Sequence, residues 1–297
     1  MARKTSSLPE LGSPYRVESG KGFKLRDFDP ADTQGLDLQA EADDLLKDSV
    51  KRLSDMQQKL YAQDRWALLL IFQAMDAGGK DSAIRHVMSG VNPQGCQVYS
   101  FKQPSNEDLS HDYLWRAHNK VPERGRIGIF NRSYYEEVLV VRVHPELLEK
   151  QRIPPSLTGK QLWRERFDDI GSFEDYLSRN GIVIRKFFLN VSKQEQKQRF
   201  LKRLDQPNKN WKFSEDDVRE RERWNDYMDA YEDMIRHTAS RNAPWFVVPA
   251  DHKWFTRLVV ASVIVEALES LKLDFPKIDK AKQKELDAAR KLLMQEQ

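Results

Sequence analysis

Apolar and polar residues alternate along the chain in two distinct patterns. Between residues 36 and 63 apolar side chains recur at steps of three and four, which predicts an amphipathic helix. Residues 66–72 form a short, continuously apolar run, which is typical of a central strand in a parallel sheet covered on both faces. Further strands are predicted at 97–101, 126–130, 182–189 and 245–248. Further helices are predicted at 82–88, 106–119, 134–142, 160–179, 193–204, 216–239 and 253–271. The alternation predicts one parallel α/β domain over residues 36–272.

The two ends of the chain differ from this central part. Residues 1–35 contain several prolines and glycines with little periodicity, which predicts an irregular arm. Residues 273–297 are rich in charge, which predicts a helical tail that is solvated or contacts a second copy.

Composition restricts the class of protein. Hydrophobic residues make up 39% of the 297 positions and charged residues 32%, which excludes a disordered chain. The net charge is only +3, so affinity for a polyanion must come from local clusters, and we expect no nucleic-acid partner. No window approaches the ~20 apolar residues of a membrane span, so no membrane partner is expected. The single cysteine, Cys96, indicates a reducing compartment, and we expect a cytoplasmic protein.

The segment after the first predicted strand has the features of a phosphate-binding loop. A strand, a glycine-containing turn, Lys80 and a helix form the arrangement in which backbone N–H groups cradle a phosphate. The pattern G-x-x-x-x-G-K-[ST] of the Walker A loop is met imperfectly, because Ala74 and Asp81 stand at two of its positions. Asp81 either caps the helix or faces the ligand. The residues expected to bind phosphate are Ala77, Gly78, Gly79, Lys80, Asp81 and Ser82.

Asp76 lies inside this loop, four residues before Lys80. A carboxylate that faces bound phosphates is repelled unless a divalent cation lies between them. Asp76 is therefore predicted to be a magnesium ligand or the acceptor of a proton from an attacking phosphate. The alternative is a carboxylate that only stabilises the turn.

The predicted strand at 126–130 ends in a second polar segment, which begins with Asn131 and Arg132. Ligands of open α/β sheets bind beyond the carboxyl ends of the strands, so this segment should lie beside the loop. The guanidinium of Arg132 is suited to grip phosphate oxygens and to neutralise charge on a phosphoryl group in transfer. The alternative is an ion pair with Glu136, one helical turn further on.

Residues 193–223 are rich in cations. Arg199 and Arg203 are one helical turn apart and can reach the same anion from one face of a helix. The alternative is a solvated helix in which acidic residues pair with these cations, a reading that fits Arg219 and Arg221.

Four segments in order resemble the polyphosphate kinase 2 family: A-M-D-A-G-G-K-D-S at 74–82, F-N-R-S-Y-Y-E-E-V-L-V-V-R-V-H at 130–144, F-L-N-V-S-K-Q-E-Q-K-Q-R-F-L-K-R at 188–203 and W-K-F-S-E-D-D-V-R-E-R-E-R-W-N-D-Y at 211–227. The resemblance extends over residues 36–271. It implies a three-layer P-loop kinase fold similar to that of thymidylate kinase. It also implies reversible, magnesium-dependent transfer of a phosphoryl group from inorganic polyphosphate to AMP and ADP.

The resemblance also implies roles for individual residues. Lys80 belongs to the phosphate loop, Asp76 binds the metal and activates phosphate, and Arg132 binds phosphate. Many members carry Asp where this chain has Asn131, which can ligate a metal only through its carbonyl oxygen. The Asn-Arg-Ser form resembles the class III branch, which phosphorylates nucleoside monophosphates and diphosphates. Glu136 is then expected to position the nucleotide or the metal.

The cationic segment becomes a lid, at about 193–224, in a protein of this family. Its residues expected to bind phosphate or nucleotide are Arg199, Arg203, Lys209, Lys212 and Arg223. The expected cofactor is Mg²⁺, with Mn²⁺ as a substitute, and the expected partners are polyphosphate, adenine or guanine nucleotides and a second copy of the chain. Two other functions remain open: an ATP-dependent nucleoside monophosphate kinase and a polyanion-binding protein without turnover.

Overall fold

A computed structural model describes residues 11–36, 39–208, 210 and 213–296. Its centre is a six-stranded sheet with the order β1-β6-β5-β2-β4-β3. The strands are β1 (Arg16–Val17), β2 (Ala67–Gln73), β3 (Cys96–Ser100), β4 (Ile127–Asn131), β5 (Ile182–Asn190) and β6 (Trp245–Pro249). Strands β2 to β6 run parallel to their neighbours, and β1 pairs antiparallel with β6. The predicted parallel sheet is confirmed for the five strands of the main domain.

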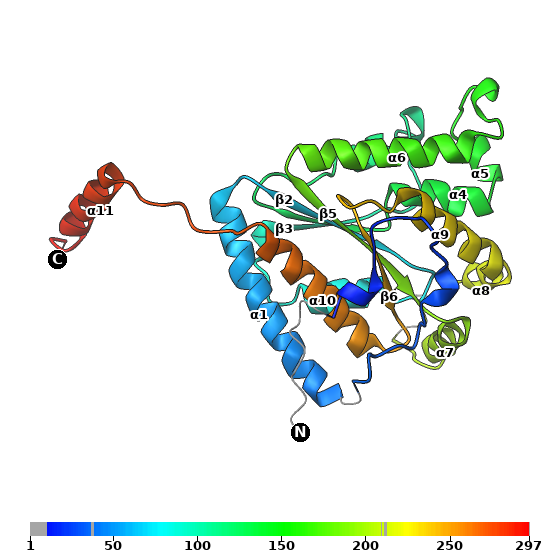
Figure 1. The fold of residues 1–297 in the computed structure, drawn as a ribbon, viewed down its shortest axis with the longest axis horizontal. Coiled ribbons are helices and arrows are strands. Elements are labelled where there is room, and N and C mark those ends of the chain that lie inside the picture. The colour runs from blue at the N-terminus through cyan, green and yellow to red at the C-terminus, as the bar shows by residue number, and fades with distance from the viewer. Residues whose placement is uncertain (1–10, 37–38, 209, 211–212, 297) are drawn as a thin grey trace.

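Helices cover both faces of the sheet. The helices are α1 (Gln39–Gln63), α2 (Lys80–Val87), α3 (Trp115–His118), α4 (Val140–Val143), α5 (Glu146–Glu149), α6 (Leu162–Arg179), α7 (Lys193–Leu204), α8 (Glu215–Glu222), α9 (Trp224–Thr238), α10 (Lys253–Ser270) and α11 (Lys280–Leu293). Helices α1 and α10 pack together on one face, and α6 and α9 lie on the other (Figure 1). The result is a three-layer α/β protein.

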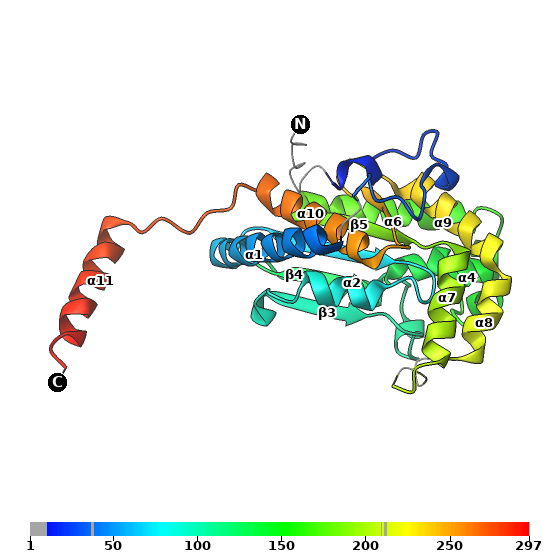
Figure 2. The same cartoon turned by 90° about the horizontal axis from the view of Figure 1, so that it is seen from below.

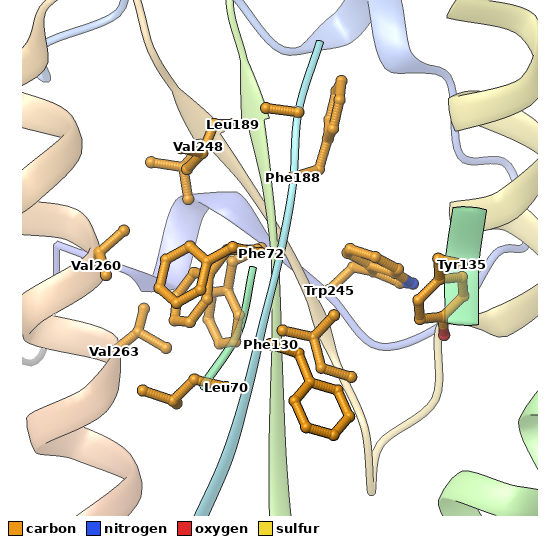
Figure 3. Packing of buried hydrophobic residues seen from close by; sticks show 14 of the residues in the cluster. Leu70, Phe72, Phe130, Tyr135, Phe188, Leu189, Trp245, Val248, Val260 and Val263 are labelled. Carbon is orange, nitrogen blue, oxygen red and sulfur yellow. The ribbon is translucent and has the colours of Figure 1, made fainter. Parts of the chain in front are cut away.

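The core lies between these layers because the central strands are apolar on both sides. Every residue of β2 and of β6 is buried. Figure 3 shows Val260 and Val263 of α10 on one side of the strands, and Trp245 and Tyr135 on the other. Helix α10 is buried nearly all round, which its apolar sequence already indicates. This core holds the strand ends that carry the site.

The N-terminal arm contributes more structure than its sequence predicts. Residues 16 and 17 form β1, and Tyr15, Val17 and Phe23 are buried in the core. The arm then reaches the carboxyl end of β5, where the side chain of Asn190 donates to the carbonyl of Phe28 at 2.9 Å. A two-residue strand gives no periodic signal, so the sequence could not show it.

Three predicted helices are interrupted. The stretch 106–119 contains only a 3₁₀ turn at 108–110 and α3, and 134–142 begins as a 3₁₀ helix at 134–138. The stretch 216–239 is divided into α8 and α9, which meet at Arg223. The C-terminal part forms α11, which stands away from the body of the molecule (Figures 1 and 2). No helix in the described part of the chain is long and apolar enough to span a membrane.

Candidate active site

The loop between β2 and α2 has the backbone conformation of a tight turn. Ala77 and Gly79 have φ angles of 58° and 107°, in the left-handed region. A Cβ atom on Gly78 would lie 2.7 Å from the Cβ of Ala74 and 2.8 Å from the carbonyl oxygen of Met75, so only glycine fits there. Helix α2 begins at Lys80 with Gly79 as its N-cap, and its first N–H groups have no intrahelical acceptor.

The ammonium of Lys80 lies under this loop. It is buried and donates to the carbonyl of Ala74 at 2.7 Å. Burial, and next the nearby Arg132, lower the pKa of Lys80 to about 8, while Asp76 opposes this change. A bound anion would favour the charged form, so the lysine is suited to accept one.

Arg132 connects the two polar segments. It follows β4 with a φ of 62°, and its N–H donates to the carbonyl of Phe72 at 3.0 Å. Its guanidinium lies 2.7 Å from Asp76 and 3.5 Å from Glu136. These carboxylates, Glu136 first, raise its pKa, so the arginine stays charged. The expected ion pair with Glu136 is present, and it does not remove Arg132 from the site.

Asp81 and Asn131 face one another. The amide nitrogen of Asn131 donates to Asp81 at 2.6 Å, and the N-cap of α2 is Gly79, so Asp81 does not cap the helix. Asp76, Asp81 and Asn131 line the same cavity, and the side-chain amide of Asn131 also carries a carbonyl oxygen that can act as an acceptor.

This donor set fits magnesium. Mg²⁺ prefers oxygen ligands and is usually held by one or two carboxylates, with phosphate and water oxygens as its other ligands. Asp76, Asp81 and Asn131 supply such oxygens beside the loop. Among the residues that the structure describes, no three His, Cys, Asp or Glu side chains gather into a metal-binding group.

A cavity of about 860 Å³ opens at the loop and the start of α2, and we call it the basic pocket. Its cationic lining residues are Lys80, Arg85, Lys102, Arg132, Arg199, Lys202, Arg203 and Lys253. Arg85, Lys102, Lys202 and Lys253 are not among the site residues predicted from the sequence. Lys102 and Lys253 follow the strands β3 and β6 closely, and this position at the carboxyl ends could have indicated them.

A second cavity, of about 500 Å³, adjoins the first, and we call it the mixed pocket. Its lining combines apolar side chains such as Val140 and Leu147 with Glu136, Tyr227 and Tyr231. The residues that line both cavities are Asp76, Phe101, Lys102, Gln103 and Arg132. The aspartate and arginine predicted from the sequence therefore lie where the two cavities meet.

The predicted cations of residues 193–224 have different surroundings. Arg203 lines the basic pocket and lies 3.6 Å from Asp217. Arg199 lines it too, but is buried against backbone carbonyls. Arg223 lines neither cavity and donates to the carbonyl of Val143 at 3.0 Å. Lys209 and Lys212 lie outside the described residues.

The fold and the site define a three-layer α/β protein whose cationic cleft is built on a glycine-containing strand–loop–helix turn at the carboxyl ends of parallel strands. A family model described as polyphosphate kinase 2 (PPK2) matches residues 37–276. The chain belongs to the polyphosphate kinase 2 family, as the four sequence segments predict.

Relatives support this over most of the chain. The chain is 56% identical over 252 residues to the ADP-polyphosphate phosphotransferase of Rhodopseudomonas palustris. The matched region covers 84% of this chain and 87% of the relative. The chain is 44% identical over 271 residues to the AMP/ADP-polyphosphate phosphotransferase of Meiothermus ruber, covering 91% and 97%. The crystal structure of polyphosphate kinase 2 from Arthrobacter aurescens is similar with a TM-score of 0.86 and 40% identity, covering 97% of this chain and 99% of that one.

Proposed function

We propose that this protein transfers the terminal phosphoryl group of inorganic polyphosphate to AMP and ADP in a reversible, magnesium-dependent reaction, on a P-loop kinase fold. The observation that carries the proposal is the meeting of the basic and mixed pockets at Asp76 and Arg132. Two anionic substrates can approach one another there, with a carboxylate and a guanidinium at the point of contact. The names of the relatives from R. palustris and M. ruber support the same donor.

The charges of the two cavities support one assignment of the two substrates. Polyphosphate carries about one negative charge per phosphate unit, and a row of cations suits a chain of this kind. The basic pocket, with its eight lysine and arginine side chains, takes the polyphosphate. The mixed pocket takes the nucleotide, because its aromatic and aliphatic walls can contact a base while Arg132 faces the phosphates.

The residues at the junction then perform the transfer. An oxygen of the nucleotide's terminal phosphate attacks the terminal phosphorus of polyphosphate, and the bond to the next bridging oxygen breaks, so the chain leaves one unit shorter. Asp76 orients the attacking phosphate, while Lys80 and Arg132 stabilise the charge on the phosphoryl group in transfer. Asp76, with Asp81 and Asn131 near it, would hold a magnesium ion, which would supply charge neutralisation to the phosphates when bound. The transfer is direct, without a covalent enzyme intermediate.

Several finer features belong to the same proposal. The Asn131-Arg132-Ser133 segment favours the class III range, in which both AMP and ADP are acceptors, and the M. ruber relative carries both in its name. Glu136, beside Arg132 in the mixed pocket, positions the nucleotide. Helices α7 and α8 form the lid over the site. Mn²⁺ can replace Mg²⁺ as the cofactor, and guanine nucleotides are further acceptors. The active form is a homo-oligomer.

The test is an incubation of the purified protein with AMP, polyphosphate and Mg²⁺ in the absence of ATP, followed by chromatography of the nucleotides. We expect ADP and then ATP, and neither product with Lys80→Ala. Conversion of added ADP alone would contradict the class III range. Turnover only after ATP is added would replace the proposal with a nucleoside monophosphate kinase, and binding of polyphosphate without any turnover would replace it with a binding protein.

A further inference from the structure

Helix α7 holds three consecutive carbonyl groups of the phosphate loop. The side-chain amide of Gln196 donates to the carbonyl of Asp76 at 2.8 Å. One terminal nitrogen of Arg199 donates to the carbonyls of Ala77 at 3.1 Å and Gly78 at 2.9 Å. Both side chains are buried, with exposed fractions of 1% and 7%. The loop is therefore fixed from behind by a helix more than a hundred residues further along the chain.

The remaining donors of Arg199 also face protein oxygens. Its second terminal nitrogen donates to the carbonyl of Ala250 and, at 3.3 Å, to that of Asp251. Its Nε atom donates to Glu195 at 2.8 Å. All three guanidinium nitrogens are therefore hydrogen bonded to the protein, although Arg199 lines the basic pocket. This geometry differs from that of an arginine whose fork is turned toward a phosphate.

The positions of these carbonyls determine where the loop N–H groups point. In a trans peptide the C=O of one residue and the N–H of the next lie on opposite sides of the bond. Carbonyls 76 and 78 face α7, so the N–H groups of Ala77 and Gly79 point the other way. Within the described part of the chain neither N–H donates to a protein acceptor, and both residues line the basic pocket. They are available to an anion.

We propose that Gln196 and Arg199 are positioning residues, which set the phosphate loop in its anion-binding conformation through its carbonyl groups, and that Arg199 is not itself a ligand of the anion. The identity of that anion rests on the proposed function. Arg221 of α8 donates to the side-chain oxygen of Gln196 at 2.5 Å and to the carbonyl of Lys193 at 3.0 Å. Gln196 therefore connects α8 with the loop through α7.

Charge and geometry can be separated by comparing lysine and methionine at two positions. Lysine keeps the charge of Arg199 but lacks the planar fork that reaches four carbonyls. We expect Arg199→Lys and Arg199→Met to lower kcat equally, by about a hundredfold. The dependence of the polyphosphate KM on salt should stay as steep as in the wild type. Arg203, which lines the basic pocket from the same helix, is the comparison.

At Arg203 the expected result is different. Arg203→Met should raise the polyphosphate KM and reduce the slope of log KM against log salt concentration by about one, because one phosphate contact is lost. Arg203→Lys should keep both values near those of the wild type. A positioning role and a charge contact are thus distinguished by the salt slope and by the effect of lysine.

The milder variant Gln196→Met keeps the shape of the side chain and removes the donor. The measurement for this variant is amide hydrogen exchange of residues 74–83 in the absence of ligand, which requires no turnover. In this segment the N–H group of Gly78 donates to the carbonyl of Met75, and that of Ala83 donates to the carbonyl of Gly79. We expect faster exchange at these amides in Gln196→Met and no change in Gln198→Met, an exposed position on α7.

Two results would overturn the inference. The first is a wild-type kcat for Arg199→Lys, together with a raised polyphosphate KM and a smaller slope of log KM against log salt concentration for Arg199→Met. This result would make Arg199 a phosphate ligand. The other is unchanged amide exchange in Gln196→Met. Because the exchange measurement uses no substrate, it decides the positioning role even where the wild type fails to use polyphosphate, a failure that would contradict only the proposed function.

Discussion

At the scale of single residues, Asp76 has the clearest expected effect. Its carboxylate lies where the two pockets meet and pairs with Arg132, which also contacts Glu136. Asp76→Asn keeps the shape and removes the charge, so we expect kcat to fall by about 10²–10³-fold while polyphosphate binding by calorimetry is retained. The control is Asp226→Asn, at an exposed position on α9. A kcat within twofold of the wild type would show that the carboxylate takes no part in the transfer.

Lys80 should give the reaction a pH dependence. Its pKa is lowered to about 8, first by burial, so the ammonium is charged below this pH and neutral above it. We expect the polyphosphate KM to rise as the pH passes upward through about 8, because a neutral amine no longer attracts the chain. In Lys80→Arg, where the guanidinium stays charged, this inflection should disappear. Persistence of the inflection in that variant would assign it to another group.

The site residues differ in how far the sequence could reveal them. Arg132 directly follows β4, and Asp76 and Lys80 belong to the loop and the helix start that follow β2. Local sequence and the position of the strand ends were therefore enough to place them together. The role of Arg199 was not visible, because its partners are backbone carbonyls of Ala77, Gly78, Ala250 and Asp251. Every residue has a backbone carbonyl, so the identity of the partner residues does not reveal such a contact.

At the scale of elements, a buried ion pair supports the segment that follows Arg132. Lys186 of β5 lies 2.6 Å from Glu174 of α6, and Glu174 also accepts from the hydroxyls of Tyr134 and Tyr135. Both charged side chains are almost fully buried, and burial lowers the pKa of Lys186.

We therefore expect Glu174→Gln to lower the free energy of unfolding by about 3 kcal/mol, since it leaves a buried ammonium without its counter-charge. Urea denaturation measures this value. The double variant Glu174→Leu with Lys186→Met should recover part of the loss, because it removes both charges. A loss below about 1 kcal/mol in the single variant would contradict the importance of the pair.

Helix α8 is attached to the body of the protein across the mixed pocket. Glu220 accepts from the hydroxyl of Tyr227 at 2.6 Å and lies 3.0 Å from Nε2 of His144, which follows α4. We expect Glu220→Gln to raise the nucleotide KM about tenfold and to leave the polyphosphate KM unchanged, because this contact shapes only the nucleotide side. Glu222→Gln, at an exposed position of the same helix, is the control. Equal effects on both KM values would contradict separate pockets.

The elements were predictable to different degrees for physical reasons. Strands β2, β4 and β6 were found because a strand buried on both faces is continuously apolar, as the seven buried residues of β2 show. Strand β1 was missed because two residues carry no period. The interruption between α8 and α9 at Arg223 was missed because the polar face of α8 continues the charge pattern without a glycine or proline.

At the scale of the whole molecule, the order of the sheet explains why distant segments meet. Strands β2 and β4 are neighbours, so the loop at 74–79 and the segment at 131–136 lie side by side, although about fifty residues separate them. Residues that follow β3 and β6 add further cations at the same edge, while the net charge of the chain remains +3. The cationic cleft is a product of topology.

The most direct test of the account is a crystal structure of Asp76→Asn with Mg²⁺, AMP and a short polyphosphate. We expect the polyphosphate in the basic pocket, with its phosphate oxygens accepting from the N–H groups of Ala77 and Gly79. The AMP should occupy the mixed pocket, with its phosphate beside Arg132. Nucleotide phosphates on the loop and a polyphosphate chain in the mixed pocket would contradict the account.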